Sequence, residues 1–457
     1  MNVPDPSLKR TNRRVEARHL IALVMAGVLI GLAFVTWRQF EIWRGEKKEP
    51  KDIPTIVTRL RSEAALTYLL RGNQRLKEGK PDEAIEQYRR ALEIDPESSE
   101  AHNNIGFILA GSGDVDQAMK RYREALRIDP KFALAHINLG DALVGRGKVD
   151  EAIGHFRQAL DVAPDRASAH YSLGRALAQK GLLAQAIKEY EEAVKLSPTY
   201  ALAYSELGNV YFKRGQYKEA TEQYRQAIKI DPGNAVPYYY LGNALLKLSQ
   251  PDQAIEQYRL AIKNDAKFGE AYSSLGNALQ ARGDPGEAIA QYRRAVESDP
   301  RYAEGHYNLA NALLSRRDYE NAIKHYRRAI ELKPKYVEAR TNLAVVLAQI
   351  GEEEEAVAQY RKTLEIAPRH EAAHYNLGLL LWQRGDERGA MAEFRAVTEI
   401  NPRDAGAHYQ SGRLLAEAGR VEQAVGEFKE ALRIDPGFTR ARQSLEQLSG
   451  SSGEIRK

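Results

Sequence analysis

Six of the ten histidines occupy one position of a 34-residue period, and imidazole is a common zinc ligand. If each period folds into one unit, equivalent residues of neighbouring units lie at least one helix diameter, about 10 Å, apart. The ligands of one zinc ion lie only about 2 Å from it. We therefore predict that this column packs the units together and binds no metal. Its members are His102, His136, His170, His306, His374 and His408.

Other patterns that carry chemistry are missing from the sequence. There is no cysteine, which excludes thiolate metal sites and cysteine nucleophiles. We find no phosphate-binding glycine loop, no nucleophile elbow and no HExxH motif. The many carboxylates are expected on solvated helix surfaces, without the pairing that an acid–base site needs. We predict a protein that is not an enzyme and that has no cofactor.

The net charge of +5 comes from the first 51 residues, which hold ten Lys and Arg against five Asp and Glu. In the rest of the chain 57 basic and 57 acidic residues cancel. A neutral surface lacks the basic patch that binds phosphate backbones, so we predict no nucleic-acid partner.

Prolines set the period of the chain, with one gap where Ala266 stands in place of a proline. Such a period indicates a stack of similar units that share a continuous core. We expect the stack to be least regular at Ala266. The prolines are Pro96, Pro130, Pro164, Pro198, Pro232, Pro300, Pro334, Pro368, Pro402 and Pro436.

One period, residues 99–132, reads as two helices joined by a turn at Gly113 and closed at Pro130. The second helix carries an alanine with an aromatic residue four positions later, and this pair recurs in every period. A small residue lets two helices approach closely, and the ring fills the space between units. The aromatic residues are Tyr88, Tyr122, Phe156, Tyr190, Tyr224, Tyr258, Tyr292, Tyr326, Tyr360, Phe394 and Phe428.

This pattern resembles the tetratricopeptide repeat (TPR) family over residues 65–438, in eleven repeats. The resemblance implies an all-α fold, a right-handed superhelix or α-solenoid of helix-turn-helix repeats, whose concave groove binds peptides. Residues 439–448 are expected to form a capping helix, and residues 449–457 a disordered tail.

The first helix of each repeat has a stripe that packing does not use, and asparagine and tyrosine recur on it. Positions five, six and nine of the repeat share one helix face. The sixth position holds Asn104, Asn138, Asn308, Asn342 and Asn376. The ninth holds Asn73, Asn209, Asn243, Asn277 and Asn311. The fifth holds Tyr171, Tyr239, Tyr307, Tyr375 and Tyr409.

An amide both donates and accepts hydrogen bonds, so a ladder of asparagines can hold a peptide backbone of any sequence. The pattern is similar to the groove of the O-linked N-acetylglucosamine transferase superhelix. The alternative is that these side chains only solvate an exposed face, although asparagine is a mediocre helix former. Glutamates at the second position indicate a basic or mixed-charge ligand, or again a solvated face. They are Glu100, Glu270, Glu304 and Glu338.

A basic tail, residues 1–19, precedes an uncharged apolar segment, residues 20–37, and a linker, residues 38–64. We predict that residues 20–37 form an uncleaved transmembrane helix in contact with the lipid bilayer, rather than a cleaved signal peptide or a buried helix. Basic residues flank both of its ends, and we favour a bacterial inner-membrane protein with periplasmic repeats. Gly27 and Gly31 would permit a homodimer.

Together these features predict a non-catalytic, membrane-anchored scaffold that binds partner peptides in its groove, in envelope or polysaccharide assembly. The alternative is an accessory targeting subunit of a separate enzyme such as a glycosyltransferase. The assignment of a pathway depends on family analogy alone.

Overall fold

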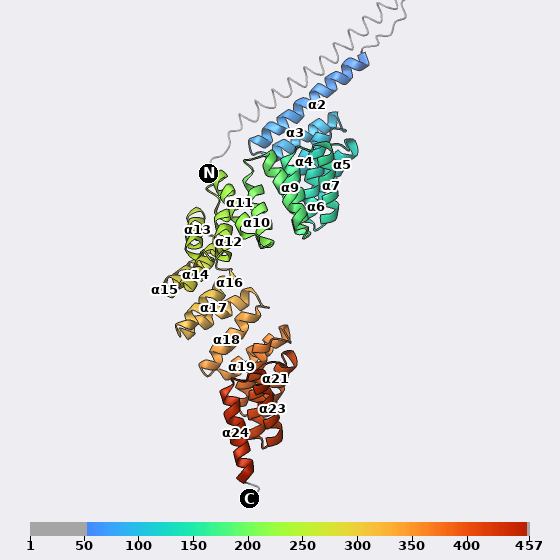
Figure 1. The fold of residues 1–457 in the computed structure, drawn as a ribbon. Helices are drawn as coiled ribbons and strands as arrows, with labels where there is room; N and C mark the ends of the chain where they lie inside the picture. The colour runs from blue at the N-terminus through green and yellow to red at the C-terminus, as the bar shows by residue number, and fades with distance from the viewer. Residues whose placement is uncertain (1–52, 455–457) are drawn as a thin grey trace, which may run out of the picture. The chain divides into compact units, whose positions relative to one another are not determined.

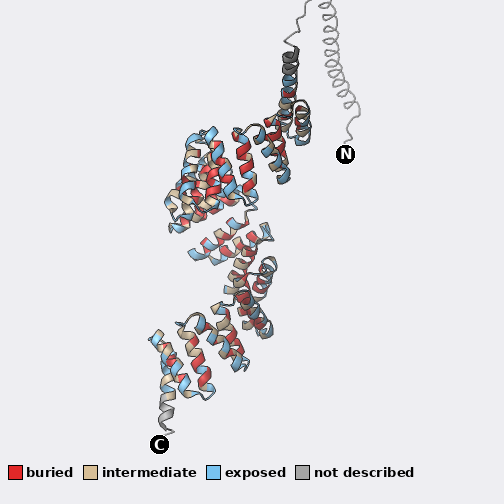
Figure 2. Cartoon of the chain, turned by 90° about the vertical axis from the view of Figure 1, so that its right-hand side faces the viewer, coloured by how far each residue is buried: buried red, intermediate tan, exposed pale blue. Residues whose placement is uncertain are grey.

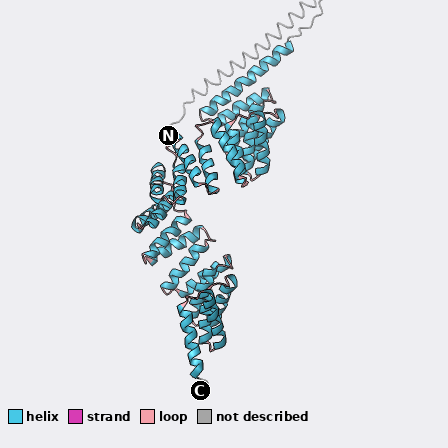
Figure 3. Ribbon diagram, viewed as in Figure 1, coloured by secondary structure: helices cyan, strands magenta, loops and turns pink. Residues whose placement is uncertain are grey.

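The computed structural model describes residues 53–454, and the regular structure in that range is helical (Figure 3). Helix–turn–helix pairs follow one another along the chain, as Figure 1 shows, and α24 (Thr439–Glu454) comes last. The first helices of the pairs are α2 (Ile53–Lys77), α4 (Ser99–Gly111), α6 (Ala133–Gly145), α8 (Ala167–Gln179), α10 (Ala201–Lys213), α12 (Ala235–Lys247), α14 (Gly269–Arg282), α16 (Ala303–Ser315), α18 (Val337–Gln349), α20 (Glu371–Gln383) and α22 (Ala405–Glu417). The second helices are α3 (Pro81–Ile94), α5 (Val115–Ile128), α7 (Val149–Val162), α9 (Leu183–Leu196), α11 (Tyr217–Ile230), α13 (Pro251–Asn264), α15 (Pro285–Ser298), α17 (Tyr319–Leu332), α19 (Glu353–Ile366), α21 (Glu387–Ile400) and α23 (Val421–Ile434).

The chain divides into two compact units, residues 1–142 and 143–457. In the described part of the first unit, α2 packs on α3, α3 on α4, and α4 on α5. In the second unit, each helix from α7 to α24 packs on the next one along the chain. This nearest-neighbour packing is that of a solenoid, so the predicted all-α solenoid is confirmed.

Two element boundaries differ from the sequence expectation. α2 begins at Ile53, inside the stretch expected to be a linker. α24 continues to Glu454, beyond the expected end of the capping helix at 448 and into the expected disordered tail.

The turn at Ala266 keeps the helix boundaries of the other repeats although it lacks the proline. The residue before it, Asp265, is extended (φ −135°, ψ 99°), and its Oδ1 accepts a hydrogen bond from the N–H of Lys267 at 2.9 Å. Asp299, which precedes Pro300, forms the same bond with the N–H of Arg301 at 2.9 Å. The aspartate therefore ends the helix by itself, and the predicted irregularity at Ala266 does not show in the helix boundaries.

The core consists of aromatic rings of the second helices packed against small residues of the first helices. Figure 2 shows the resulting buried stripes. Tyr258 is fully buried, and a Cβ atom added to Gly242 would lie 2.6 Å from its ring. Phe394 and Gly378 repeat this contact, with a corresponding distance of 2.9 Å. The close approach explains why the period keeps a small residue at this position.

The histidine column closes the turns between repeats. His136 Nε2 lies 3.0 Å from the carbonyl oxygen of Pro130, six residues earlier, and His170 makes the same contact with Pro164 at 3.0 Å. Arg340 replaces a histidine of the column and donates to the Pro334 carbonyl at 3.0 Å. Because the arginine bonds the equivalent proline carbonyl of its own repeat, the position serves hydrogen bonding to the turn. Within residues 53–454 no group of three metal-ligating side chains is assembled.

The predicted single-pass membrane localisation has to be corrected. Among the helices of residues 53–454, none is both long and apolar enough to cross a bilayer. The one helix of sufficient length, α2, carries charges at Arg61, Glu63 and Arg71, which are costly in a hydrocarbon layer. The segment 20–37 and the pair Gly27 and Gly31 lie outside the described residues. The structure therefore gives no support for a single-pass membrane protein.

Candidate functional site

The ninth-position asparagines each accept a hydrogen bond from a core tyrosine of the same helix pair. The tyrosine lies 15 residues later, on the second helix, and its hydroxyl donates to the asparagine Oδ1. Four of these pairs are consecutive, on α10 to α17. The donor–acceptor distances are 2.7 Å for Tyr88 and Asn73, 2.8 Å for Tyr224 and Asn209, 2.7 Å for Tyr258 and Asn243, 2.7 Å for Tyr292 and Asn277, and 2.5 Å for Tyr326 and Asn311.

This bond determines which end of each amide faces the core. Burial raises the pKa of Tyr258, so its hydroxyl keeps its proton and needs an acceptor. The Oδ1 of Asn243 supplies that acceptor, and the amide nitrogen is left on the open side. The asparagines themselves are half-buried, except Asn277, which is exposed.

The amide nitrogens of this set are largely unused within the chain. Nδ2 of Asn209 lies 3.5 Å from a carboxylate oxygen of Glu206. In the described part of the chain, no hydrogen bond engages the Nδ2 atoms of Asn243, Asn277 and Asn311. We call Asn209, Asn243, Asn277 and Asn311 the amide ladder. In Asn243, Asn277 and Asn311 the oxygen accepts a hydrogen bond from a core tyrosine while the Nδ2 donor is left unused by the described residues.

A pattern in the sequence could have revealed that the ninth-position asparagines accept hydrogen bonds from the core tyrosines. The ninth position holds asparagine only in repeats whose core ring is a tyrosine. In the three repeats with a phenylalanine, Phe156, Phe394 and Phe428, the ninth position holds Asp141, Leu379 and Arg413 instead. A phenylalanine has no proton to donate, so it does not need the amide oxygen. The two columns therefore show that asparagine occurs here only with a tyrosine, whereas the repeats of Tyr122, Tyr190 and Tyr360 have Phe107, Arg175 and Val345 in its place.

The sixth-position asparagines bond to the preceding repeat. Asn342 Nδ2 donates to Asn311 Oδ1 at 2.9 Å, so that oxygen receives two hydrogen bonds. Asn104 makes the equivalent bond to Asn73 at 3.0 Å. Asn138 donates to Asn103 at 2.9 Å, and Asn308 donates to the Ser273 hydroxyl at 2.8 Å. Among the described residues Asn376 makes no such bond. Most of this column thus links neighbouring repeats.

The fifth-position tyrosines also span the junction between repeats, and all of them are half-buried. In four of the five, the ring packs against an aromatic residue 29 positions later, at the start of the next repeat. Tyr375 has Asp404 there instead and packs on Phe394, with a centroid distance of 5.8 Å. The four pairs and their centroid distances are Tyr171–Tyr200 (4.9 Å), Tyr239–Phe268 (5.0 Å), Tyr307–Tyr336 (5.1 Å) and Tyr409–Phe438 (5.0 Å).

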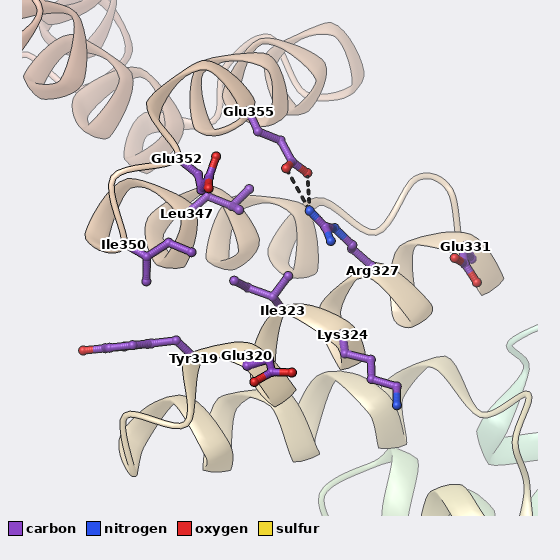
Figure 4. A pocket seen from close by; sticks show the side chains of 10 residues that line it. All are labelled: Tyr319, Glu320, Ile323, Lys324, Arg327, Glu331, Leu347, Ile350, Glu352 and Glu355. Atoms are coloured by element: carbon purple, nitrogen blue, oxygen red, sulfur yellow. Dashed lines mark hydrogen bonds and ion pairs between the residues drawn. The ribbon is translucent and has the colours of Figure 1, made fainter.

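A separate shallow cavity of about 780 Å³ lies over α17 and the turn between α18 and α19 (Figure 4). Ile323 and Ile350 give it an apolar floor, and Tyr319 lies at one side. Its arginine, Arg327, is paired with Glu355 at 2.8 Å. That ion pair links two successive repeats, as Arg259 and Glu287 do elsewhere, so Arg327 and Glu355 serve packing between repeats.

Helix pairs stacked in sequence, with one face left open, define the protein as a repeat solenoid. Three family profiles, described as tetratricopeptide repeat or TPR repeat, match it and together run without a gap from residue 72 to 437. The chain therefore belongs to the tetratricopeptide repeat family. The first profile matches residues 137–201, 239–303, 273–337, 307–371, 354–404 and 375–437, the second 72–113, 111–145 and 208–249, and the third 189–222.

Solved structures similar to parts of the chain include MamA, which is 29% identical over 36% of this chain and 97% of its own, with a TM-score of 0.34. YrrB, described as a TPR protein with an unusual peptide-binding site, is 28% identical over 40% of this chain and 95% of its own, with a TM-score of 0.34. PilF of Pseudomonas aeruginosa is 24% identical over 45% of this chain and 94% of its own, with a TM-score of 0.42. No curated protein sequence matches the chain.

Proposed function

We propose that the protein is a non-catalytic scaffold that binds an extended polypeptide along the amide ladder. The observation that carries the proposal is the set of four consecutive ninth-position amides whose oxygens are held by core tyrosines. The unused donors of Asn243, Asn277 and Asn311 recur once per repeat at one position of the first helix, which is the arrangement that a linear ligand needs.

A polypeptide backbone suits a row of donors because it offers a carbonyl acceptor at every residue. Recognition through the backbone tolerates many side-chain sequences. Each hydrogen bond contributes about 0.5–1.5 kcal/mol, so several repeats must act together to give useful affinity. The tyrosine hydroxyls hold the amides in the required orientation before the ligand arrives, which lowers the entropy lost on binding.

The test uses variants in which the free donors of the ladder become acceptors, while the hydrogen bond from each core tyrosine is kept. Asn243→Asp combined with Asn277→Asp retains an oxygen for each tyrosine hydroxyl but replaces each free donor by an acceptor. Gln253→Glu combined with Gln291→Glu adds the same charge on second helices and serves as the control. Peptides selected on the wild-type protein from a displayed random library are then measured by fluorescence anisotropy.

We expect the ladder variant to bind the selected peptides at least about tenfold more weakly, since two bonds of about 0.7 kcal/mol would be lost. The control should bind within about twofold of wild type. Equal binding by the ladder variant, or failure of the library to yield any binder, would refute the proposal. A role in envelope or polysaccharide assembly stays a prediction. So does a role as a targeting subunit of another enzyme.

A further inference from the structure

Arginines at two positions of the repeat pair with carboxylates of a neighbouring repeat. Between α13 and α15, Arg259 Nη2 lies 2.8 Å from Oε1 of Glu287, 28 residues later. Arg282, the last residue of α14, lies 4.0 Å from the other oxygen of Glu287 and 3.6 Å from a carboxylate oxygen of Asp252, 30 residues earlier. The carboxylate of Glu287 therefore lies between two guanidinium groups, whose planar forks suit a carboxylate.

One repeat later both arginines remain, but both carboxylates are missing. Arg293 and Arg316 are the counterparts of the two arginines, 34 residues further along the chain. Asn321 stands where the bridging glutamate would be, and Gly286 stands where the aspartate would be. Both arginines are exposed, and neither forms an ion pair within the described residues. The junction between α15 and α17 thus keeps the cations of the pairing scheme without their anions.

The side chain of Arg316 lies where its counterpart lies in the complete junction. A Cβ atom added to Gly286 would lie 3.6 Å from Nη2 of Arg316, so this guanidinium group lies over α15. Arg282 reaches α13 in the same way, because its Nη1 lies 3.6 Å from Asp252. The geometry of the arginine is therefore retained although its partner is absent.

Asn321 also occupies the one other carboxylate that could have served. Its Nδ2 donates to both carboxylate oxygens of Asp318, at 3.0 Å and 2.9 Å. In the preceding repeat the equivalent aspartate, Asp284, instead pairs with Arg282 at 2.6 Å. The amide thus replaces one carboxylate and holds a second one away from the arginine.

Arg293 and Arg316 line one cavity of about 570 Å³, over α15 and the turn between α16 and α17. Arg294 and Glu297 also line it and pair with each other at 3.9 Å along α15. Two guanidinium groups without a partner therefore converge on a space that is large enough to admit a side chain.

We propose that Arg293 and Arg316 bind a carboxylate side chain of a partner, so that this cavity is a docking site for an acidic polypeptide segment. The bound carboxylate would take the place that Glu287 takes one repeat earlier, between the two arginines. The site is separate from the amide ladder, because no ladder asparagine lines the cavity, so it does not depend on the proposed function.

The probes are two labelled peptides of equal length, in which serine alternates with glutamate or with glutamine. Both offer the same backbone to the ladder, so the difference between them reports the carboxylates. Binding to the full chain is measured by fluorescence anisotropy at low salt, because exposed ion pairs are screened. Arg293→Gln combined with Arg316→Gln removes the site. Arg214→Gln combined with Arg225→Gln is the control, with the same two repeat positions and the same charge change at two other junctions.

A second pair of variants fills the site instead of removing it. Asn321→Glu keeps both arginines and supplies a carboxylate from the chain, as Glu287 does one repeat earlier. Gln253→Glu adds the same charge at the equivalent position two repeats earlier and is its control.

We expect the glutamate peptide to bind the wild-type protein more tightly than the glutamine peptide. The double variant of Arg293 and Arg316 should weaken the glutamate peptide about fivefold, as should Asn321→Glu, and neither should affect the glutamine peptide. Both controls should stay within about twofold of wild type. The ladder variant, Asn243→Asp with Asn277→Asp, carries two added charges far from the cavity and should still distinguish the two peptides.

Three outcomes would overturn the inference and leave the proposed function intact. In the first, the glutamate peptide binds wild type no more tightly than the glutamine peptide. In the second, the control at Arg214 and Arg225 weakens the glutamate peptide as much as the variant at Arg293 and Arg316, which indicates only the general charge of the protein. In the third, Asn321→Glu binds the glutamate peptide as wild type does, although its carboxylate should exclude the ligand.

Discussion

Two stretches of the second unit share one core but present different open faces. In the ladder repeats, α10 to α17, the ninth position is always asparagine. In the C-terminal repeats, α18 to α23, it is Val345, Leu379 and Arg413. There Arg413 lies 4.5 Å above the Trp382 ring, and the Trp382 indole N–H donates to Glu417 at 3.0 Å. The buried rings and small residues are alike in both stretches, so packing leaves the open face free to vary.

The largest expected effect tests whether the two stretches have equivalent cores. Tyr258→Ala in the ladder repeats and Phe394→Ala in the C-terminal repeats each remove a fully buried ring. We expect each to lower the free energy of unfolding by about 3–5 kcal/mol, measured by urea denaturation with circular dichroism. Native-state hydrogen exchange should place the loss in the mutated repeat and its neighbours. A loss in only one of the two stretches would contradict a shared core.

Enlarging the small residue of the second helix should have a smaller effect, again in both stretches. Ala288 and Ala390 are almost completely buried where the helices of a pair approach. Ala288→Leu and Ala390→Leu should each cost about 1–3 kcal/mol, because the extra carbons have no space. An unchanged urea midpoint for both variants would show that the alanines are not needed for close approach.

Removing a single core tyrosine hydroxyl should lower stability in the ladder repeats more than in the C-terminal repeats. Tyr258→Phe deletes the partner of Asn243 and should cost about 0.5–1.5 kcal/mol. Tyr360→Phe in the C-terminal repeats should change stability by less than about 0.5 kcal/mol, because Val345 stands where the asparagine would be.

Tyr190→Phe sharpens this comparison further. The Tyr190 hydroxyl is buried without a hydrogen-bond partner among the described residues, and Arg175 occupies the ninth position of its repeat. Its removal should leave stability unchanged or raise it slightly. If Tyr258→Phe is equally harmless in the same urea titrations, the tyrosine hydroxyls do not orient the ladder.

The sequence predicts the fold more completely than the site, for a physical reason. The helices of each repeat end at Asp, Pro or Gly residues. Each of these acts within its own turn, as Asp265 does, so the period alone places the helices. The site depends on distant pairs. Asn342 meets Asn311 across 31 residues, and Tyr307 meets Tyr336 across 29. These contacts depend on the register between stacked pairs, which helical periodicity does not specify.

The smallest expected effect is a change in the stability of the protein at acidic pH. In the ladder repeats His306 Nδ1 lies 2.9 Å from His325 Nδ1, whereas in the C-terminal repeats His374 Nδ1 lies 2.5 Å from the carboxylate of Glu393. Two imidazoles can share one hydrogen bond only while one of them is neutral and accepts. Burial, then the neighbouring His306, then Lys324 and Arg293 lower the pKa of His325 to about 4, and burial also lowers that of His306.

The sign of the pH dependence follows from the lowered pKa. The unfolded chain, in which His325 has an ordinary pKa of about 6.5, binds more protons than the folded protein between pH 6.5 and 4. Stability is therefore lost as pH falls through that window. His325→Glu would rebuild the histidine–carboxylate pair of the C-terminal repeats and should reduce the drop in urea midpoint between pH 7 and about 4.5. An identical drop in the variant would mean that groups other than His325 account for the acid sensitivity.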